Sequence, residues 1–317
     1  MELMKLRVRV LVCYPFFDNS VNSTHQVLTW SRLRTHHESA NMITTNREIV
    51  KRTYGFSELL TKNAKLKKGR ASYNVRGLAL APAKMSGRNV CPESGFCGSI
   101  CVLWFAGRTV TRSVRAAMKA RTDLFFEDRE RFLALLQLAI RHHVSRCRNA
   151  GELPVVRLNT ASDLPWERIA PQLFTDNPDV TFYDYTKITS RALAYSRGQL
   201  PDNYHVTYSV SERSNDNVVR DILERGSNVA VVVDSAWNPQ QGIVGKIPKT
   251  FAIGGKRFQT ADGDEHDIRI PELDGSGNVV MLRGKGGIVN VIDGVAAGFI
   301  RKVNSGRATT HAIESVA

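Results

Sequence analysis

The sequence lacks the segments that take a chain into or across a membrane. No run of 18 or more apolar residues, the length of a membrane-spanning helix, occurs among its 317 residues. The apolar stretch within residues 1–17 is too short, and has no small-residue cleavage site, for a secretory signal peptide. We therefore expect a soluble, cytoplasmic protein with no membrane partner.

Cysteine is scarce, and its number is odd. Five cysteines in a long chain without an export signal disfavour a disulfide framework and favour metal binding or free thiols. Three of them lie within eleven residues, in the segment NVCPESGFCGSIC: Cys91, Cys97 and Cys101. This clustering needs one common explanation, whereas the isolated Cys13 and Cys147 do not.

Positive charge is concentrated in one third of the chain. Residues 51–148 hold 20 lysines and arginines against 6 aspartates and glutamates, a surplus equal to the formal net charge of +14 of the whole chain. Such a block neutralises phosphates and releases counterions, so a nucleic acid or nucleotide is the leading class of partner. The alternative is a solvated helix face with a basic arm. The candidate phosphate contacts are Arg108, Arg112, Arg115, Lys119 and Arg121.

Strand and helix patterns alternate from about residue 73 onward. A short buried strand at 74–83 precedes the cysteine loop, and residues 109–149 predict one or two long amphipathic helices. Strands separated by short helices follow at 153–163, 179–187, 203–212 and 227–236. This alternation predicts parallel βαβ units, in an open doubly wound sheet or a full or partial barrel. No GxGxxG or Walker sequence follows any strand, which disfavours the nucleotide folds that depend on those loops.

Three regions follow from these patterns. Residues 1–70 predict an irregular basic N-terminal arm with one helix near 55–65. Residues 71–270 predict the barrel-like core that carries the cysteine loop. Residues 271–317 predict a small β-rich C-terminal appendage and a flexible tail, because turn signals such as DGSGN interrupt the alternation.

Each of the four later strands ends in polar or ionisable residues. Ligands of parallel α/β folds bind at the carboxyl ends of the strands, so these ends predict one shared site. The alternative is that some of these side chains only cap the following helices, as the positions of Asp163 and Ser211 permit. The strand-end residues are Asn159, Ser162, Asp163, Asp184, Thr186, Lys187, Ser209, Ser211, Glu212, Asp234 and Ser235.

The spacing of the clustered thiols, Cys-x5-Cys-x3-Cys, leaves several explanations open. Structural zinc sites pair ligands as Cys-x2-4-Cys and need a fourth ligand, here Cys147, His142, His143 or His266. An iron–sulfur cluster on three thiolates leaves one iron open to a substrate or cofactor, and matches three close cysteines better. Glycines in the loop would let it curl around a bulky cluster. Three unligated buried cysteines are the remaining alternative.

A strand, a three-cysteine loop, a helix and then strands with polar ends resemble the radical S-adenosylmethionine (SAM) enzymes. The spacing usual in that family is Cys-x3-Cys-x2-Cys, from which this sequence departs. The resemblance implies an α/β fold with a partial (β/α) barrel of radical-SAM type. It also implies a 4Fe-4S cluster on Cys91, Cys97 and Cys101, S-adenosylmethionine and an electron donor. Zinc stays the alternative metal on the residues alone.

The same resemblance assigns roles to the strand ends. The second strand end would contact the amino group of the methionine moiety, and the fourth its carboxylate or the ribose. The implied cofactor-binding residues are Asn159, Ser162, Ser209 and Ser211. The candidate catalytic residues are Asp163, Lys187 and Glu212. The lysine would bind a phosphate or a carboxylate at the mouth of the barrel.

A second set of motifs resembles a phage-borne family called gene product 88, which carries no established activity. The motifs, in order, are VRLNTASD, FYDYTK, YSVSERSND, DGDEHD and LRGKG. The likeness covers roughly residues 73–302 and implies a bacterial host. The DGDEHD segment, residues 262–267, offers carboxylates and an imidazole that could relay protons or bind a divalent cation, or form only a polar turn.

Two functions from different classes follow. The first is a radical-SAM-like iron–sulfur enzyme of phage or mobile-element origin that acts on a nucleic acid or nucleotide. The second is a metal-stapled basic nucleic-acid-binding protein, with a role in replication or DNA processing and without radical chemistry. Glycosyl transfer in a zinc-bearing barrel, with Asp163 or Asp184 as the nucleophile, ranks last.

Overall fold

The computed structural model describes residues 47–62, 66, 72–101, 103, 111–238, 243–285 and 287–303. All of them belong to one unit, residues 40–317. The predicted N-terminal arm up to residue 46, and Arg108, lie outside the described residues. No helix in the described part is long and apolar enough to cross a membrane.

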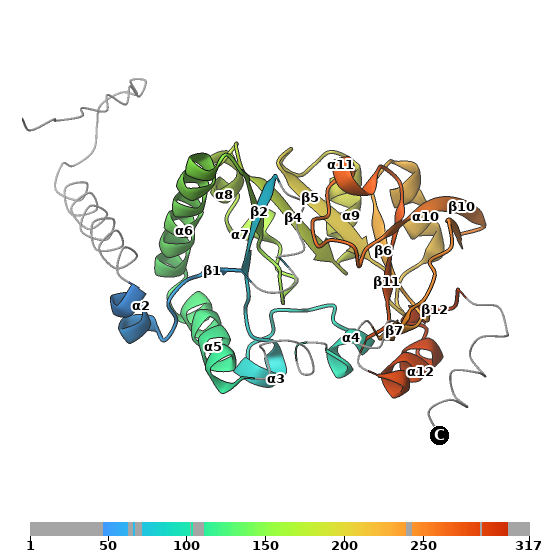
Figure 1. Cartoon of the computed structure of the whole chain (residues 1–317), viewed down its shortest axis with the longest axis horizontal. Helices are drawn as coiled ribbons and strands as arrows, with labels where there is room; N and C mark the ends of the chain where they lie inside the picture. The colour runs from blue at the N-terminus through green and yellow to red at the C-terminus, as the bar shows by residue number, and fades with distance from the viewer. Residues whose placement is uncertain are drawn as a thin grey trace, which may run out of the picture. The chain divides into compact units, whose positions relative to one another are not determined.

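A mostly parallel sheet of ten strands forms the centre of the fold (Figure 1). Its strands are β1 (Leu60–Thr61), β2 (Tyr73–Leu78), β3 (Leu153–Arg157), β4 (Thr181–Thr186), β5 (Tyr204–Ser209), β6 (Val229–Val233), β9 (Thr250–Ile253), β10 (Lys256–Asp262), β11 (Val279–Arg283) and β12 (Ile300–Arg301). The order is β1-β2-β3-β4-β5-β6-β11-β10-β9, with β12 also paired to β6. A separate hairpin consists of β7 (Trp237–Asn238) and β8 (Ile243–Val244).

The strands β2 to β6 are neighbours in space in the same order as in sequence, and each pair is parallel. This confirms the predicted βαβ units, without the reversal of strand order that marks a doubly wound sheet. Only β1 and β9, at the two ends of the strand order, pair antiparallel. Each has a single described neighbour, so the described sheet is open. The α/β fold class is confirmed, while closure into a partial barrel stays a prediction.

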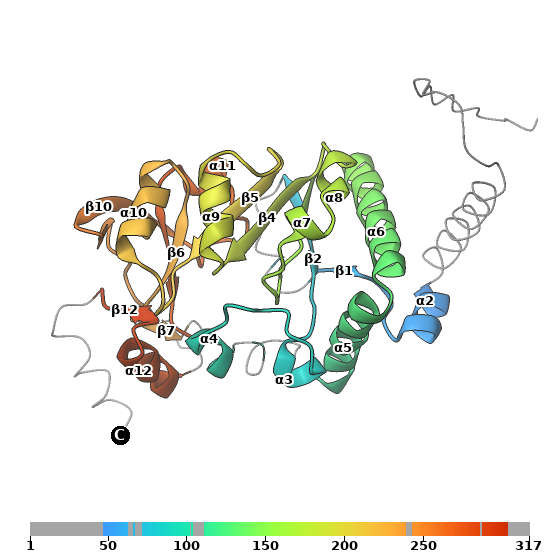
Figure 2. The ribbon, with the colours of Figure 1, turned by 180° about the vertical axis from the view of Figure 1, so that it is seen from behind.

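The helices follow the predicted alternation. They are α2 (Arg47–Tyr54), α3 (Ala83–Ser86), α4 (Phe96–Ser99), α5 (Arg112–Glu127), α6 (Arg129–Ala150), α7 (Trp166–Ile169), α8 (Gln172–Thr175), α9 (Thr189–Ser196), α10 (Asp216–Glu224), α11 (Pro271–Asp274) and α12 (Ile288–Ala296). The connections α7 to α10 lie in front of the sheet in Figure 2. They cover one face of the sheet, as right-handed crossovers between parallel strands require.

Local signals account for the ends of the first helices. Asp128 caps α6, because its side chain accepts the backbone N–H of Arg131 at 2.9 Å, and Gly151 ends this helix with a φ of 66°. The helix expected near 55–65 lies earlier, at α2. Gly55, with a φ of 74°, donates its N–H to the carbonyl of Lys51 and terminates that helix.

The opposite face of the sheet is covered by the segment after β10. Ile268 and Ile270 pack against Val75, Val155 and Tyr183 of β2, β3 and β4. Between these apolar residues lies a buried ion pair, in which Arg157 of β3 donates to both oxygens of Asp267 at 3.1 and 3.0 Å. The chain thus fills this side of the sheet with its own residues.

The position of β11 differs from the prediction of a separate C-terminal appendage, because this strand lies in the main sheet. Its sequence VVMLR is almost wholly buried, which is typical of a central parallel strand. It pairs with β6 on one side and with β10 on the other. Residues 279–301 therefore complete the main sheet instead of forming a separate β-rich unit.

Candidate functional site

The cysteine loop lies over the carboxyl end of β3. The backbone N–H of Asp163 donates to the carbonyl of Val90 at 2.8 Å, just before the first cysteine. The thiol of Cys91 then lies 3.6 Å from the carbonyl of Ala161. The structure thus brings the first predicted thiol to the predicted strand end that carries Asn159, Ser162 and Asp163.

Glu212, just beyond β5, holds the middle of the same loop. Its Oε1 accepts the backbone N–H of Phe96 at 3.0 Å. A Cβ added to Gly95 would lie 2.2 Å from this oxygen, and Gly95 has a φ of 51°, so the position suits only glycine. The other oxygen, Oε2, is buried and makes no hydrogen bond within the described part of the chain. Glu212 is therefore an anchor of the loop.

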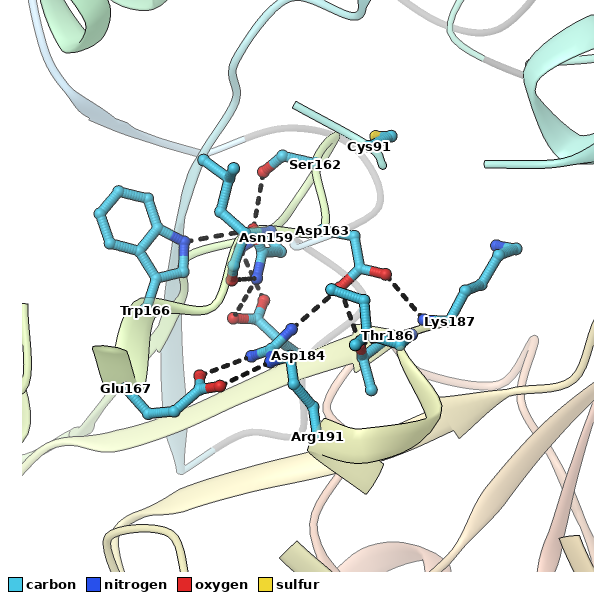
Figure 3. A network of polar contacts seen from close by, with 12 residues as sticks. Cys91, Asn159, Ser162, Asp163, Trp166, Glu167, Asp184, Thr186, Lys187 and Arg191 are labelled. Carbon is cyan, nitrogen blue, oxygen red and sulfur yellow. Dashed lines mark hydrogen bonds and ion pairs between the residues drawn. The ribbon is translucent and has the colours of Figure 1, made fainter. Parts of the chain in front are cut away.

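A buried polar network lies beneath the loop (Figure 3). Asp163 accepts the hydroxyl of Thr186 at 2.8 Å and the guanidinium of Arg191 at 2.9 Å on Oδ1. Its Oδ2 accepts the backbone N–H of Lys187 at 2.7 Å. Both carboxylate oxygens are thus used to join β3 to the end of β4 and to α9. This arrangement makes Asp163 a structural residue of the strand ends.

Arg191 is the centre of the network. It donates to both oxygens of Glu167 at 2.9 Å and to the hydroxyl of Tyr204 at 2.8 Å, in addition to its bond with Asp163. Its side chain is 1% exposed, and a buried guanidinium needs such a full set of acceptors. Sequence reasoning missed Arg191, Glu167 and Tyr204, because none of them ends a strand.

Asn159 has no hydrogen-bonding capacity left for a ligand. Its Oδ1 accepts the Ser162 hydroxyl at 2.8 Å, the Leu164 N–H at 2.9 Å and the Trp166 indole N–H at 3.2 Å. Its Nδ2 donates to the Leu164 carbonyl at 3.0 Å and to Asp184 at 3.1 Å. The amide is thus saturated. Asn159 therefore shapes the end of β3 and cannot accept from the amino group of a cofactor, whereas the half-buried Ser162 uses its hydroxyl only as a donor in these bonds.

Asp184 is sealed within the sheet. It is 0% exposed, and it accepts the backbone N–H of Asn159 at 2.6 Å and the hydroxyl of Tyr204 at 2.8 Å. Burial raises the pKa of Asp184 to about 7, although the charge of Arg157 opposes the change. With Asp163 also fully bonded, the glycosyl-transfer alternative has no accessible carboxylate nucleophile at these strand ends.

Lys187 is a strand-end cation that remains available. Its side chain is half-buried and makes no ion pair with the described residues. The Nζ atom lies 5.9 Å from the ring centre of Phe299. In Figure 3 the side chain extends away from the network on the side where Cys91 lies. Burial raises the pKa values of Cys91 and Cys101, and the positive charge of Lys187 partly opposes this rise.

Burial raises the pKa values of two of the three thiols, Cys91 and Cys101. Burial raises the pKa of Cys91 to about 12, and the charges of Asp163, Cys97 and Cys101 act in the same direction. Burial also raises the pKa of Cys101, and Cys97 adds to this effect. Within the described residues, however, no three His, Cys, Asp or Glu side chains converge as ligands of a metal ion.

Three of the four predicted fourth zinc ligands have other partners. The thiol of Cys147 lies 3.6 Å from Nδ1 of His143, whose Nε2 donates to the carbonyl of Asn74 at 3.0 Å. His266 contacts the guanidinium of Arg269, with 3.1 Å between the nitrogens. His142 is exposed on α6.

The two serines at the end of β5 have different surroundings. Ser211 is buried, and its hydroxyl accepts the backbone N–H of Arg213 at 3.3 Å. It therefore shapes the turn before α10, whose N-cap is Asn215. Ser209 is half-buried, and its hydroxyl makes no hydrogen bond to the residues that the structure describes. Of the predicted cofactor-binding residues, Ser209 has the most freedom to meet a ligand.

The prediction that Arg121 contacts a phosphate is wrong, because its side chain is buried. It is 6% exposed, its Nε donates to the carbonyl of Glu58 at 2.9 Å, and its guanidinium lies 5.4 Å from the ring centre of Phe56. Burial lowers the pKa of Arg121 to about 10. It therefore fastens the segment before β1 to α5 and cannot reach a nucleic acid.

The other candidate phosphate contacts on α5 form a thin basic surface. Arg112 and Lys119 are exposed, and Arg115 is half-buried. The ammonium group of Lys119 pairs with Asp123 at 2.7 Å, four residues further along the helix. This surface therefore offers less free positive charge than its sequence predicts.

The DGDEHD and LRGKG motifs bind each other. Arg283 pairs with Asp262 at 2.8 Å and with Asp264 at 3.2 Å, and Lys285 pairs with Asp264 at 2.6 Å. The carboxylate of Asp267 accepts from Arg157 and Tyr183. These carboxylates are thus neutralised by cations of the chain, and the described geometry supports the structural alternative for this segment.

Comparison with known proteins agrees with the second set of motifs. The family model described as Gene product 88 matches residues 57–308, which include the cysteine loop and every described strand end. The Gene 88 protein of Mycobacterium phage L5 is 26% identical over 193 residues, which cover 57% of this chain and 68% of that protein. No solved structure matches. The chain thus belongs to the Gene product 88 family.

Proposed function

We propose that the chain is an iron–sulfur enzyme organised like the radical SAM enzymes, and that its substrate is a nucleotide or a nucleic acid. The observation that carries this proposal is the position of the cysteine loop. Hydrogen bonds join it to the ends of β3 and β5, where parallel α/β folds bind their ligands. Burial raises the pKa values of Cys91 and Cys101, and the neighbouring thiols of the loop add to both effects.

Three clustered thiols are the number that would hold a 4Fe-4S cluster and leave one iron open. No three of the described side chains converge as ligands of one ion, which counts against a mononuclear zinc site with any of the four predicted fourth ligands. Cys91, Cys97 and Cys101 would hold the cluster.

The surrounding residues would orient and shield such a group. Glu212 fixes the loop through Phe96, and the network around Asp163 holds the strand ends rigid. Lys187, which is half-buried, would bind a phosphate or a carboxylate of the substrate. A cluster on three thiolates leaves one iron for S-adenosylmethionine or substrate, and supplies one-electron chemistry.

Anaerobic purification tests the cluster. We expect a brown protein that contains iron and sulfide and absorbs near 400 nm, a property that the Cys91→Ala, Cys97→Ala, Cys101→Ala triple variant loses. Cys147→Ala is the matched control, because this cysteine is buried in α6 and bonded to His143. It should keep both colour and metal. A colourless protein with stoichiometric zinc would overturn the proposal and favour the metal-stapled nucleic-acid-binding alternative.

A second measurement tests the cofactor. The reduced, cluster-containing protein is incubated with S-adenosylmethionine, and release of 5′-deoxyadenosine is followed by chromatography. We expect release that falls in Lys187→Ala and is retained in Arg168→Ala, which removes an exposed charge from α7. If the intact cluster releases nothing from S-adenosylmethionine, the radical-SAM part of the proposal is wrong, although the cluster itself stands.

A further inference from the structure

Exposed cations gather on the second half of α6. Arg141, Arg146 and Arg148 are all exposed, and none pairs with a carboxylate of the described residues. The last ten residues of the helix, 141–150, contain no acidic residue, whereas Glu130 lies in its first turn. The first turn carries Arg129 and Arg131 beside Glu130, so both ends of α6 are basic and the larger surplus, three arginines without a carboxylate, lies in the second half.

The helix dipole explains only part of this pattern. Basic side chains stabilise a helix within its last turn, where Arg148 lies. Arg141 is two turns earlier, and the dipole has little effect there. An ordinary solvated helix face also mixes charges of both signs. The surplus on this face thus calls for a partner of opposite charge.

A neighbouring helix extends the basic face. Residues of α2 and α6, among them Val50, Ala139 and His142, line one cavity of about 100 Å³, so the two helices lie beside each other there. Lys51 and Arg52, which follow Val50, are exposed and have no ion-pair partner within the described part. We define the α2/α6 face by Lys51, Arg52, Arg141, His142, Arg146 and Arg148. At about 100° per residue Arg141 and Arg148 lie on one stripe of α6, whereas His142 and Arg146 lie on the adjoining side that lines the cavity.

Basic side chains line part of this cavity. Arg76, His142 and Arg146 line it, and the one lining carboxylate is that of Glu58. Glu58 lies 3.4 Å from Arg76, and its side chain is 25% exposed. His142 and Arg146 are both exposed and both line the cavity. An anionic group that enters from solvent would therefore meet two nitrogen donors.

We propose that the α2/α6 face binds the phosphate backbone of a nucleic acid. From Arg141 to Arg148 the helix rises about 10 Å, the length of about three successive phosphates of one strand at 3.4 Å each. The contacts are with phosphates only, so binding is independent of base sequence. None of these residues belongs to the cysteine loop or to the strand-end network, so this surface stands or falls separately from the iron–sulfur proposal.

Fluorescence anisotropy with a labelled DNA duplex of about 20 base pairs, in a series of salt concentrations, tests this proposal. The full chain is compared with the Arg141→Ala, Arg146→Ala, Arg148→Ala variant. Alanine is the best helix former, so α6 is retained, and circular dichroism and urea unfolding confirm it. The matched control, Arg168→Ala, Arg197→Ala, Lys249→Ala, removes the same charge from exposed positions elsewhere.

The expected result is a change in both affinity and salt dependence. Each lost phosphate contact reduces the slope of log K against log salt by about 0.9, so the α6 variant should lose roughly 3 units of slope. Its affinity at about 0.1 M salt should fall at least tenfold, and that of the control by less than about twofold. Equal losses in the two variants, or none in the α6 variant, would overturn the proposal.

Discussion

The carboxylate of Glu212 occupies the space that a side chain at Gly95 would need, since a Cβ there would lie 2.2 Å from Oε1. We expect Gly95→Ala to displace the cysteine loop and to lower the free energy of unfolding by about 1–3 kcal/mol. Gly87→Ala is the control, because Gly87 also has a positive φ, 75°, but has open space around it.

A double-mutant cycle in urea unfolding separates the contact from the backbone strain. Glu212→Ala removes the obstructing carboxylate, so Gly95→Ala should cost less in that background. Glu212→Gln keeps an oxygen acceptor for the Phe96 N–H and should destabilise less than Glu212→Ala. Strictly additive effects of the two substitutions would show that the close approach does not constrain the loop.

Arg191 joins two buried carboxylates, those of Asp163 and Glu167, at 2.9 Å each. Arg191→Met should lower the free energy of unfolding by about 3–5 kcal/mol, because both carboxylates remain buried without their cation. Urea unfolding measures the change. Arg225→Met is the control, since Arg225 pairs with Asp221 on the surface of α10 and its loss should leave stability nearly unchanged. A small effect of Arg191→Met would mean that water enters the network.

His143 should make stability depend on pH. Burial lowers its pKa to about 4 from the ordinary 6.5, so between these values the unfolded chain binds a proton that the folded chain does not. Stability due to this group therefore increases as pH rises from about 4 to 6.5, by about 3 kcal/mol in total. Urea unfolding at several pH values tests this.

The histidine effect is measured as a difference between variants. His143→Gln keeps a donor for the Asn74 carbonyl and should flatten the rise in stability, whereas His142→Gln, its exposed neighbour, should not. The comparison is necessary because Asp184, whose pKa is raised to about 7, contributes the opposite slope. Its raised pKa stabilises the folded state fully below pH 3.8, and this stabilisation is lost as the pH rises to 7.

Cys91 should be the slowly reacting thiol of the metal-free loop. Burial raises the pKa of this thiol to about 12. Near pH 8 its thiolate fraction is therefore on the order of 10³-fold lower than that of an ordinary thiol, and its alkylation by iodoacetamide is slower by the same factor. Lys187→Met should slow the reaction further, because the lysine charge lowers this pKa. Mass spectrometry of the alkylated peptide gives the rate, with Arg168→Met as the control. An unchanged rate in Lys187→Met would place the ammonium group away from the thiol.

Local patterns predicted the elements, because hydrophobic periodicity and turn residues act over a few positions. The position of β11 between β6 and β10 could not be predicted from these patterns, because strand order depends on contacts between distant segments. The polar network around Arg191 could not be predicted for the same reason, because Arg191 follows Asp163 by 28 residues and Glu167 by 24.

Burial of Arg121 could have been predicted. The buried residues of α5 are Met118, Arg121, Thr122 and Phe125, which follow the i, i+3, i+4, i+7 pattern of an apolar helix face. The role of the strand-end residues, by contrast, could not be predicted from the sequence. Polar residues such as Asn159 and Asp163 suit a ligand or an internal network equally well by type, and only the donors and acceptors around them distinguish the two.

The strand order has a consequence for how the chain is made. The hairpin of β9 and β10 is synthesised before β11, yet β11 joins it to β6. During translation, this hairpin has no parallel neighbour until residues 279–283 leave the ribosome, and one edge of β6 stays unpaired for that interval. A nascent or truncated chain that stops before residue 279 would expose this edge to strands of other molecules, as unprotected edges promote aggregation.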